Sequence, residues 1–345
     1  MGHEYYMHRC LQLAKNGKET VSPNPRVGSV VVHNNTIIAE GWHRKAGEPH
    51  AEVLAIGAVA DQSLLSTSTL YVNLEPCAHH GRTPPCSDLI IEKQIPRVVI
   101  GSRDPFSEVN GKGIAKLKKA GTDVIEGVLQ QECLHLNRRF FTFHQKKRPY
   151  VILKWAQSAD GFMDRERSAD QKGPNWITGK ESKILVHSWR AEEDAILIGA
   201  QTALNDQPAL TVREVSGKNP IRLVIDPQLR VNPNLTVLDE TSENLVFNYK
   251  TATKERSTEW VKLDESTAAL QQILQECYRR NIQSMMVEGG ARTLQRFIEA
   301  GYWDEARVFT GTPNFGKGLK APLLQGHYQA QSQWGADTLQ VIYNL

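Results

Sequence analysis

Residues 74–86 read LEPCAHHGRTPPC, and they follow a His-Ala-Glu triplet at residues 50–52. The two segments supply a His, a Glu two residues later and a Pro-Cys with a second Cys, which are the parts of a zinc-dependent deaminase site. We expect His50, Cys77 and Cys86 to hold a metal ion and to leave the fourth tetrahedral position to water. Glu52 is then the group that transfers protons between this water and a departing ammonia. The pattern favours an enzyme.

The spacing of the two cysteines departs from the commonest deaminase pattern, because eight residues rather than two separate them. A structural zinc with His79 or His80 as a fourth ligand is one alternative, and an ordinary buried Cys or hydrogen-bonded His is another. The local context favours the catalytic interpretation, since Cys77 follows a strand-like segment and Cys86 opens a helix-like one. The start of a helix favours the thiolate form that binds metal.

Length and composition describe an ordinary globular protein with more than one domain. The chain has 345 residues, 40% of them hydrophobic and 23% charged, with a net charge of +3. No Lys- or Arg-rich block predicts a nucleic-acid surface, and residues 1–17 contain no apolar stretch that suits a signal peptide or a membrane span. The five cysteines form no disulfide framework. We therefore expect a cytoplasmic protein without nucleic-acid or membrane partners.

Alternating helix-like and strand-like segments predict α/β layers in both halves of the chain. Residues 140–149 change from apolar to basic and end in a proline, which predicts two domains at residues 1–147 and 148–345. In the second domain, a strand-like segment runs into Gly289-Gly290 and then into a helix-like one. Such a turn can hold a phosphate on backbone N–H groups, although a glycine pair also allows a close helix contact.

Further segments in both halves of the chain carry a resemblance that covers nearly its whole length. They read PNPRVG at residues 23–28, KWAQSADG at 154–161, NDQPALTVR at 205–213 and VEGG at 287–290. With these segments, the chain resembles the family of bifunctional riboflavin-biosynthesis deaminase–reductases. The resemblance implies an α/β fold with an N-terminal cytidine-deaminase-like three-layer domain and a C-terminal dihydrofolate-reductase-like domain.

The resemblance also implies two consecutive reactions on a phosphorylated pyrimidine. The first is hydrolytic deamination of 2,5-diamino-6-ribosylamino-4(3H)-pyrimidinone 5′-phosphate at one catalytic Zn²⁺ per chain. The second is reduction of the ribosyl group to ribityl with NADPH. Members of such families often assemble, so we expect a homo-oligomer. The main alternative is a deaminase of another pyrimidine or purine fused to a reductase-like domain, because the zinc chemistry would be the same.

Residue roles in both domains are carried over from matching positions. In the deaminase half, Asn24 is assigned to the substrate, as are His79 and Arg82, which are equally consistent with a solvated loop. In the reductase half, the residues assigned to the nicotinamide cofactor are Ala156, Trp176, Thr202, Asp206, Gly290, Ala291, Arg292 and Thr293. The residues assigned to the reductase substrate are Arg190, Leu210, Arg213 and Glu288.

The reductase half departs from the family pattern at three places. Pro174 stands where the family usually has a small hydroxyl residue, and residues 164–173 form a longer and more charged loop than expected. Arg292 lies in an altered glycine turn, where it can contact a cofactor 2′-phosphate or face solvent. These departures leave the expected class of reaction unchanged.

Overall fold

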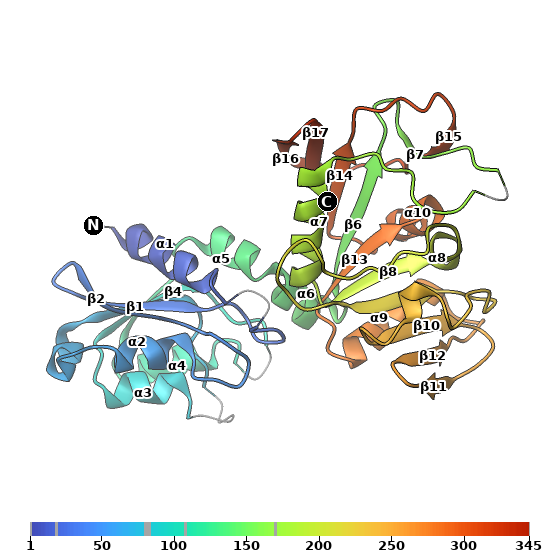
Figure 1. The fold of residues 1–345 in the computed structure, drawn as a ribbon. Coiled ribbons are helices and arrows are strands. Elements are labelled where there is room, and N and C mark those ends of the chain that lie inside the picture. Colours follow the sequence, from blue (N-terminus) through green and yellow to red (C-terminus); the bar gives the residue numbers. More distant parts are fainter. Residues whose placement is uncertain (1, 18–19, 79–83, 107–108, 169–170, 345) are drawn as a thin grey trace. The chain divides into compact units, whose positions relative to one another are not determined.

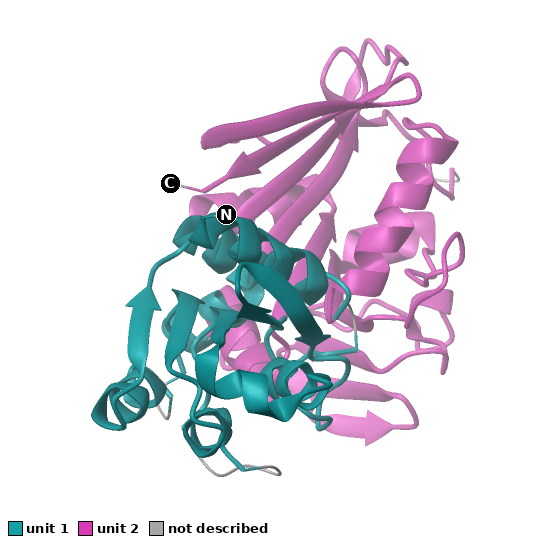
Figure 2. Cartoon of the chain, turned by 90° about the vertical axis from the view of Figure 1, so that its left-hand side faces the viewer, with its two compact units in different colours: residues 1–147 teal, residues 148–345 magenta. Residues whose placement is uncertain are grey.

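The computed structural model describes residues 2–344 except 18–19, 79–83, 107–108 and 169–170 (Figure 1). The chain divides into two compact units, residues 1–147 and residues 148–345 (Figure 2). In the described part of the chain, no helix combines the length and the apolar character needed to cross a membrane.

The first unit is built on a five-stranded sheet with the strand order β2-β1-β3-β4-β5. Strand β1 pairs antiparallel with β2 and β3, and β3, β4 and β5 are parallel to one another. The strands are β1 (Gly28–His33), β2 (Thr36–Trp42), β3 (Thr69–Leu74), β4 (Arg97–Ser102) and β5 (Asp123–Glu126). Asn34 and Asn35 connect β1 to β2 at φ values of 46° and 61°, the left-handed backbone that asparagine tolerates in a two-residue hairpin.

Helices cover both faces of this sheet and confirm the expected three-layer α/β domain (Figure 1). On one face, α2 (Ala51–Gly57), α3 (Cys86–Glu92) and α4 (Lys112–Lys119) bury Ile56, Ile90 and Leu117 against the strands. On the other face, α1 (His3–Ala14) and α5 (Gln130–Leu136) bury Met7 and Cys133. The remaining elements are the 3-10 helix η1 (Gln62–Thr67) and α6 (Arg138–Lys146).

Helix α1 lies so close to β1 that only glycine fits at residue 28. A Cβ atom added to Gly28 would lie 2.2 Å from the Cys10 carbonyl oxygen and 2.8 Å from the Ala14 backbone nitrogen. Gly28→Ala should therefore force α1 off the sheet and lower the free energy of unfolding of this unit by about 1–3 kcal/mol, measurable by urea denaturation. Gly57→Ala is the control, because a Cβ there meets open space. Equal stability of the two variants would contradict the close approach.

The second unit contains a ten-stranded sheet with the order β11-β12-β10-β9-β8-β13-β6-β14-β17-β16, and a two-stranded sheet of β15 and β7. The central strands are parallel, and both edges of the large sheet are antiparallel. The strands are β6 (Tyr150–Gln157), β7 (Phe162–Arg165), β8 (Ala195–Gly199), β9 (Ile221–Ile225), β10 (Asn244–Asn248), β11 (Thr253–Glu255), β12 (Thr258–Lys262), β13 (Ser284–Gly289), β14 (Glu305–Thr310), β15 (Gly318–Lys320), β16 (His327–Trp334) and β17 (Asp337–Tyr343).

Helices also flank the large sheet on two faces. Helices α9 (Ala269–Arg279) and α10 (Ala291–Glu299) bury Ile273 and Phe297 in the main core of this unit. Helix α7 (Lys180–Glu192) packs Val186 against the C-terminal strands, and α8 (Ala200–Asp206) packs Ala203 in a separate cluster. A short 3-10 helix, η2 (Thr236–Leu238), completes the unit. The result is a mostly parallel α/β sheet, whose carboxyl-terminal strand ends are the usual place for a ligand.

Candidate functional site

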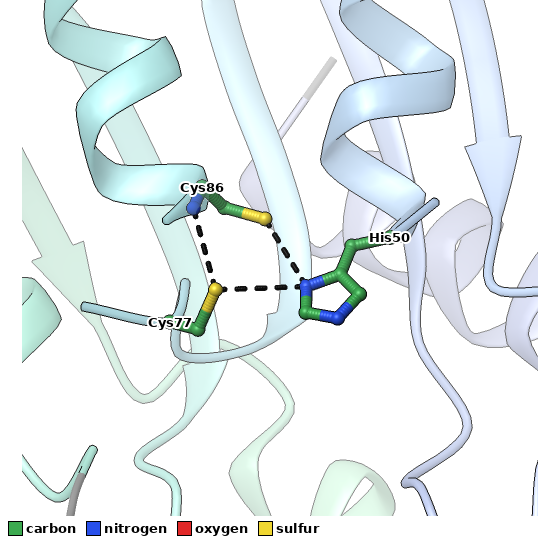
Figure 3. A group of neighbouring side chains, drawn as sticks. All are labelled: His50, Cys77 and Cys86. Atoms are coloured by element: carbon green, nitrogen blue, oxygen red, sulfur yellow. Dashed lines mark hydrogen bonds between the residues drawn. The ribbon is translucent and has the colours of Figure 1, made fainter. Parts of the chain in front are cut away.

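His50, Cys77 and Cys86 lie close together beyond the carboxyl-terminal end of β3, the central strand of the first sheet (Figure 3). His50 caps the N-terminus of α2, Cys77 follows β3, and Cys86 is the first residue of α3. Their candidate ligand atoms all lie within 4.8 Å of one another, with 3.3 Å between His50 Nδ1 and Cys86 Sγ and 3.5 Å between His50 Nδ1 and Cys77 Sγ. One imidazole and two thiols at this spacing fit a three-ligand zinc site with an open fourth position.

A buried carboxylate anchors the loop that carries Cys77. Glu75 accepts backbone N–H groups from Gly111 at 2.9 Å and from Ile114 at 3.2 Å, so it ties this loop to the start of α4. Gly113 allows the approach, because a Cβ atom there would lie 2.0 Å from the Pro76 carbonyl oxygen. These contacts help to fix the position of the segment that carries Cys77.

Electrostatics favour a thiolate at Cys77. The pKa of Cys77 is lowered to about 4, chiefly because the Cys86 thiol donates to its sulfur and because His50 lies beside it. The Cys86 backbone N–H also donates to Cys77 Sγ, at 3.3 Å. Glu52, in the first turn of α2, is 3% exposed and lies beside the Cys86 thiol without belonging to the three-residue group. Burial raises the pKa of Glu52.

The structure links Asn24 to this cluster through a histidine that the sequence analysis missed. Asn24 Nδ2 lies 3.1 Å from Nε2 of His43, and the His43 ring contacts the His50 ring edge-on with 5.5 Å between centroids. Burial lowers the pKa of His43. Its only signal in the sequence is its place at the end of β2, seven residues before His50. The expected substrate residues His79 and Arg82 lie outside the described residues.

A cavity of about 760 Å³ in the second unit collects most of the expected cofactor residues. Its lining includes Thr202, Asp206, Gly290, Ala291, Arg292 and Thr293. A Cβ atom on Gly290 would lie 3.0 Å from Thr202 Oγ1, and one on Gly199 would lie 2.6 Å from Thr293 Oγ1. The glycines thus let the N-termini of α8 and α10 approach each other, and a phosphate placed there meets backbone N–H groups. These residues fit a dinucleotide cofactor.

Two expected cofactor residues lie outside the lining of this cavity. Ala156 is on β6, partly buried against the cluster under α7. Trp176 is 66% exposed, and the Lys183 ammonium lies 5.6 Å from the centre of its ring. Their assignment to the cofactor therefore stays a prediction that the lining of this cavity does not test.

Two of the expected reductase substrate residues, Arg190 and Glu288, form a buried ion pair. Arg190 donates from Nε and Nη2 to the two carboxylate oxygens of Glu288 at 2.7 and 2.8 Å. Glu288 also lines the cavity, so this pair lies next to the expected cofactor residues. Leu210 is buried with a φ of 53°, and the Arg213 backbone N–H donates to His187 Nδ1 at 3.0 Å.

Two residues near this pair were missed in the sequence. Lys154 Nζ lies 4.0 Å from Glu288 Oε2, and its pKa is lowered by burial. His187 is buried, and its pKa is lowered to about 4 by burial and by Arg190 and Arg213, so it is a neutral acceptor. Lys154 lies in the quoted segment 154–161, whereas His187 shares one helix face with Arg190, three residues later.

The ion pair predicts an acid-dependent stability for the second unit. Burial opposes ionisation of Glu288, but Arg190 and Lys154 outweigh it and lower its pKa from 4.5 to about 2. A lowered pKa stabilises the folded state above pH 4.5, and this contribution is lost as pH falls through 2. The free energy of unfolding should therefore decrease between pH 4.5 and pH 2, and Glu288→Gln should flatten this decrease. A variant with the wild-type pH slope in acid denaturation would contradict the assignment.

Comparisons with known proteins find matching families for both halves of the chain. Residues 1–102 match the family model of the cytidine and deoxycytidylate deaminase zinc-binding region, and residues 149–341 match that of the RibD C-terminal domain. The riboflavin biosynthesis protein RibD of Aquifex aeolicus is 41% identical over 324 residues, which cover 91% of this chain and 88% of the relative. RibD of Escherichia coli K12 is 37% identical over 331 residues, 90% of this chain and 87% of the relative.

Solved structures show the same architecture. A diaminohydroxyphosphoribosylaminopyrimidine deaminase/5-amino-6-(5-phosphoribosylamino)uracil reductase from Thermotoga maritima has a TM-score of 0.89 and 37% identity, covering 99% of this chain and 98% of that one. RibD of Acinetobacter baumannii has a TM-score of 0.87 and 29% identity with the same coverage.

Fold and sites together define a two-domain enzyme, in which a zinc-type deaminase is joined to a reductase. The chain belongs to the RibD family of riboflavin biosynthesis proteins. It is accordingly a bifunctional deaminase and reductase of riboflavin biosynthesis, and the expected two-part α/β fold is confirmed. Membership in this family does not favour the alternative of a deaminase with another pyrimidine or purine substrate.

Proposed function

We propose that residues 1–147 deaminate 2,5-diamino-6-ribosylamino-4(3H)-pyrimidinone 5′-phosphate and that residues 148–345 reduce the ribosyl group of the product with NADPH. The observation that carries the first half is the meeting of His50, Cys77 and Cys86 beside the buried Glu52. The names of the related proteins supply the substrate class. The reducing cytoplasm is the proposed compartment, because the five cysteines are all free thiols.

In the deaminase half, His50, Cys77 and Cys86 hold one Zn²⁺. A zinc ion bound there supplies an acidified water at neutral pH. Glu52 would transfer two protons in turn: one from the attacking water to the ring nitrogen, and a second from the hydroxyl group added to the ring carbon to the departing ammonia. Asn24, held by His43, binds the pyrimidine or the ribose, and His79 and Arg82 are the proposed contacts of the substrate or its phosphate.

In the reductase half, local charge suits a phosphorylated substrate. Lys154 and Arg190 provide two cationic side chains beside one carboxylate, that of Glu288. Arg213 lies near His187 and Glu214. The excess positive charge attracts the substrate phosphate, and a guanidinium binds phosphate through two N–H groups. Leu210 is the proposed apolar contact of the substrate.

The cavity residues favour NADPH over NADH. The turn Gly290–Thr293 holds the cofactor phosphates, while Ala156, Trp176, Thr202 and Asp206 are the other proposed contacts. Arg292 and Arg296 also line the cavity, and within the described residues neither has a carboxylate partner. Their guanidinium groups are suited to the 2′-phosphate that distinguishes NADPH from NADH.

The test is turnover by the purified protein with and without NADPH. Ammonia should appear without NADPH, and NADPH should be oxidised only after ammonia release begins. Ammonia release without any NADPH oxidation would overturn the reductase half. A zinc-loaded protein that releases no ammonia from this substrate would overturn the deaminase half.

We further propose that the chain forms a homo-oligomer. Strand β16 ends the large sheet, its residues 327–333 are exposed, and it contains no Asp, Glu, Lys or Arg. The opposite edge strand, β11, is short and carries Lys254 and Glu255, which discourage pairing with another strand. Sedimentation velocity should show more than one chain per particle, and a monomer at micromolar concentration would contradict the proposal.

A further inference from the structure

Arg167 lies inside the cofactor cavity, in the charged loop that departs from the family pattern. Its side chain is 12% exposed and uses three different nitrogens. Nε donates to Asp164 Oδ2 at 2.5 Å, Nη2 donates to Asp206 Oδ1 at 2.8 Å, and Nη1 donates to the Gly173 carbonyl at 2.9 Å. Arg167 therefore joins the loop to the end of α8.

Arg167 reduces the negative charge of the cavity, which would otherwise repel the phosphates of the cofactor. Three carboxylates line it, those of Asp164, Asp206 and Glu288. Glu288 is neutralised by Arg190, which donates to both of its oxygens. Asp164 and Asp206 would repel a cofactor that carries several phosphate charges, unless a cation lies between them. Arg167 is that cation.

The contacts also fix the orientation of the two carboxylates. Asn175 Nδ2 donates to Asp164 Oδ1 at 2.6 Å, so Asp164 is held on one oxygen by Asn175 and on the other by Arg167. Arg167 engages Oδ1 of Asp206 and leaves Oδ2 for a cofactor hydroxyl. Burial raises the pKa of Asp206, and Arg167 opposes this shift, so it favours the ionised acceptor.

We propose that Arg167 is a positioning residue for the nicotinamide cofactor: it neutralises Asp164 and Asp206 and aims Asp206 into the cavity. This inference rests on the proposed use of NADPH by the second unit. Arg165 provides a matched comparison in the same loop, because its guanidinium lies 4.7 Å from the centre of the Phe315 ring and it does not line the cavity.

The experiment is a fluorescence titration of the full-length protein with NADPH, without substrate. Arg167→Ala should raise the dissociation constant by about tenfold or more, and Arg165→Ala should stay within about twofold of wild type. Arg167→Lys, which keeps the charge, should stay within about threefold. Asp164→Asn added to Arg167→Ala should recover at least about threefold of the loss, because it removes one uncompensated charge. The rescue uses Asp164 since Asp206 is itself a proposed cofactor contact.

The outcomes separate charge compensation from a structural role. Recovery in the double variant supports the proposal, and an equal loss in Arg167→Ala and the double variant overturns it. Arg167→Ala with wild-type affinity also overturns it. Thermal unfolding without cofactor identifies a variant that fails to fold. If Arg167→Ala fails to fold, the affinity of Arg167→Lys is used instead, and a loss well beyond threefold in this charge-retaining variant overturns charge compensation. If wild-type protein binds no NADPH, the proposed cofactor itself is overturned, and this result is seen before any substitution is made.

Discussion

Glu52→Gln is expected to lower the rate of ammonia release by about 10³-fold or more while the zinc content stays at one ion per chain. Glu52 lies in the first turn of α2, two residues after His50, and is almost completely buried. It is not one of the three grouped ligand residues, so its loss does not remove a metal donor. Glutamine has nearly the same shape but cannot accept and return a proton, and general acid–base catalysis contributes about 10²–10⁴-fold.

Two measurements make this expectation decisive. Zinc is measured by atomic absorption in the same preparation as ammonia release, and Glu92→Gln serves as a control because Glu92 is exposed at the end of α3. Retained zinc with lost turnover assigns proton transfer to Glu52. Loss of zinc or of folding in Glu52→Gln would instead show that this carboxylate is needed to build the site, and normal turnover would remove it from the mechanism.

The elements near the metal group were predictable because their signals are local. A strand followed by Pro76-Cys77, and a proline pair followed by Cys86, place the ligands at a strand end and a helix start, as the structure shows. The hairpin at Asn34-Asn35 rests on an equally local feature, since two asparagines between apolar runs suit the left-handed backbone of a tight turn. In each case, the decisive residues lie within a few positions of one another.

Contacts between distant segments were not predictable in this way. Arg167 was noticed only as part of a charged loop, since its partner Asp206 is 39 positions away and nothing in the sequence pairs them. Strand β16 escaped notice because it is exposed on both faces and so lacks the alternation that marks a half-buried strand. Trp176 was assigned to the cofactor from its family position alone, and this assignment stays a prediction.

Cys86→Ser is expected to abolish zinc binding and ammonia release together, while NADPH binding by residues 148–345 remains within about twofold of wild type. The substitution replaces a thiolate with a hydroxyl, which is a much poorer zinc ligand, and among the described residues it leaves His50 and Cys77 to hold the metal. Every described residue that lines the cofactor cavity belongs to the second unit, whereas the metal group belongs to the first. Metal analysis and NADPH fluorescence on one sample measure both effects.

Cys133→Ala is the matched control for this experiment. Cys133 is also a buried cysteine of the first unit, but it packs against α1 and the sheet and is not part of the metal group. Its variant should lose some stability and keep its zinc, which separates a ligand from a cysteine that only fills space. If Cys86→Ser loses NADPH binding as well, the two units are not independent of each other.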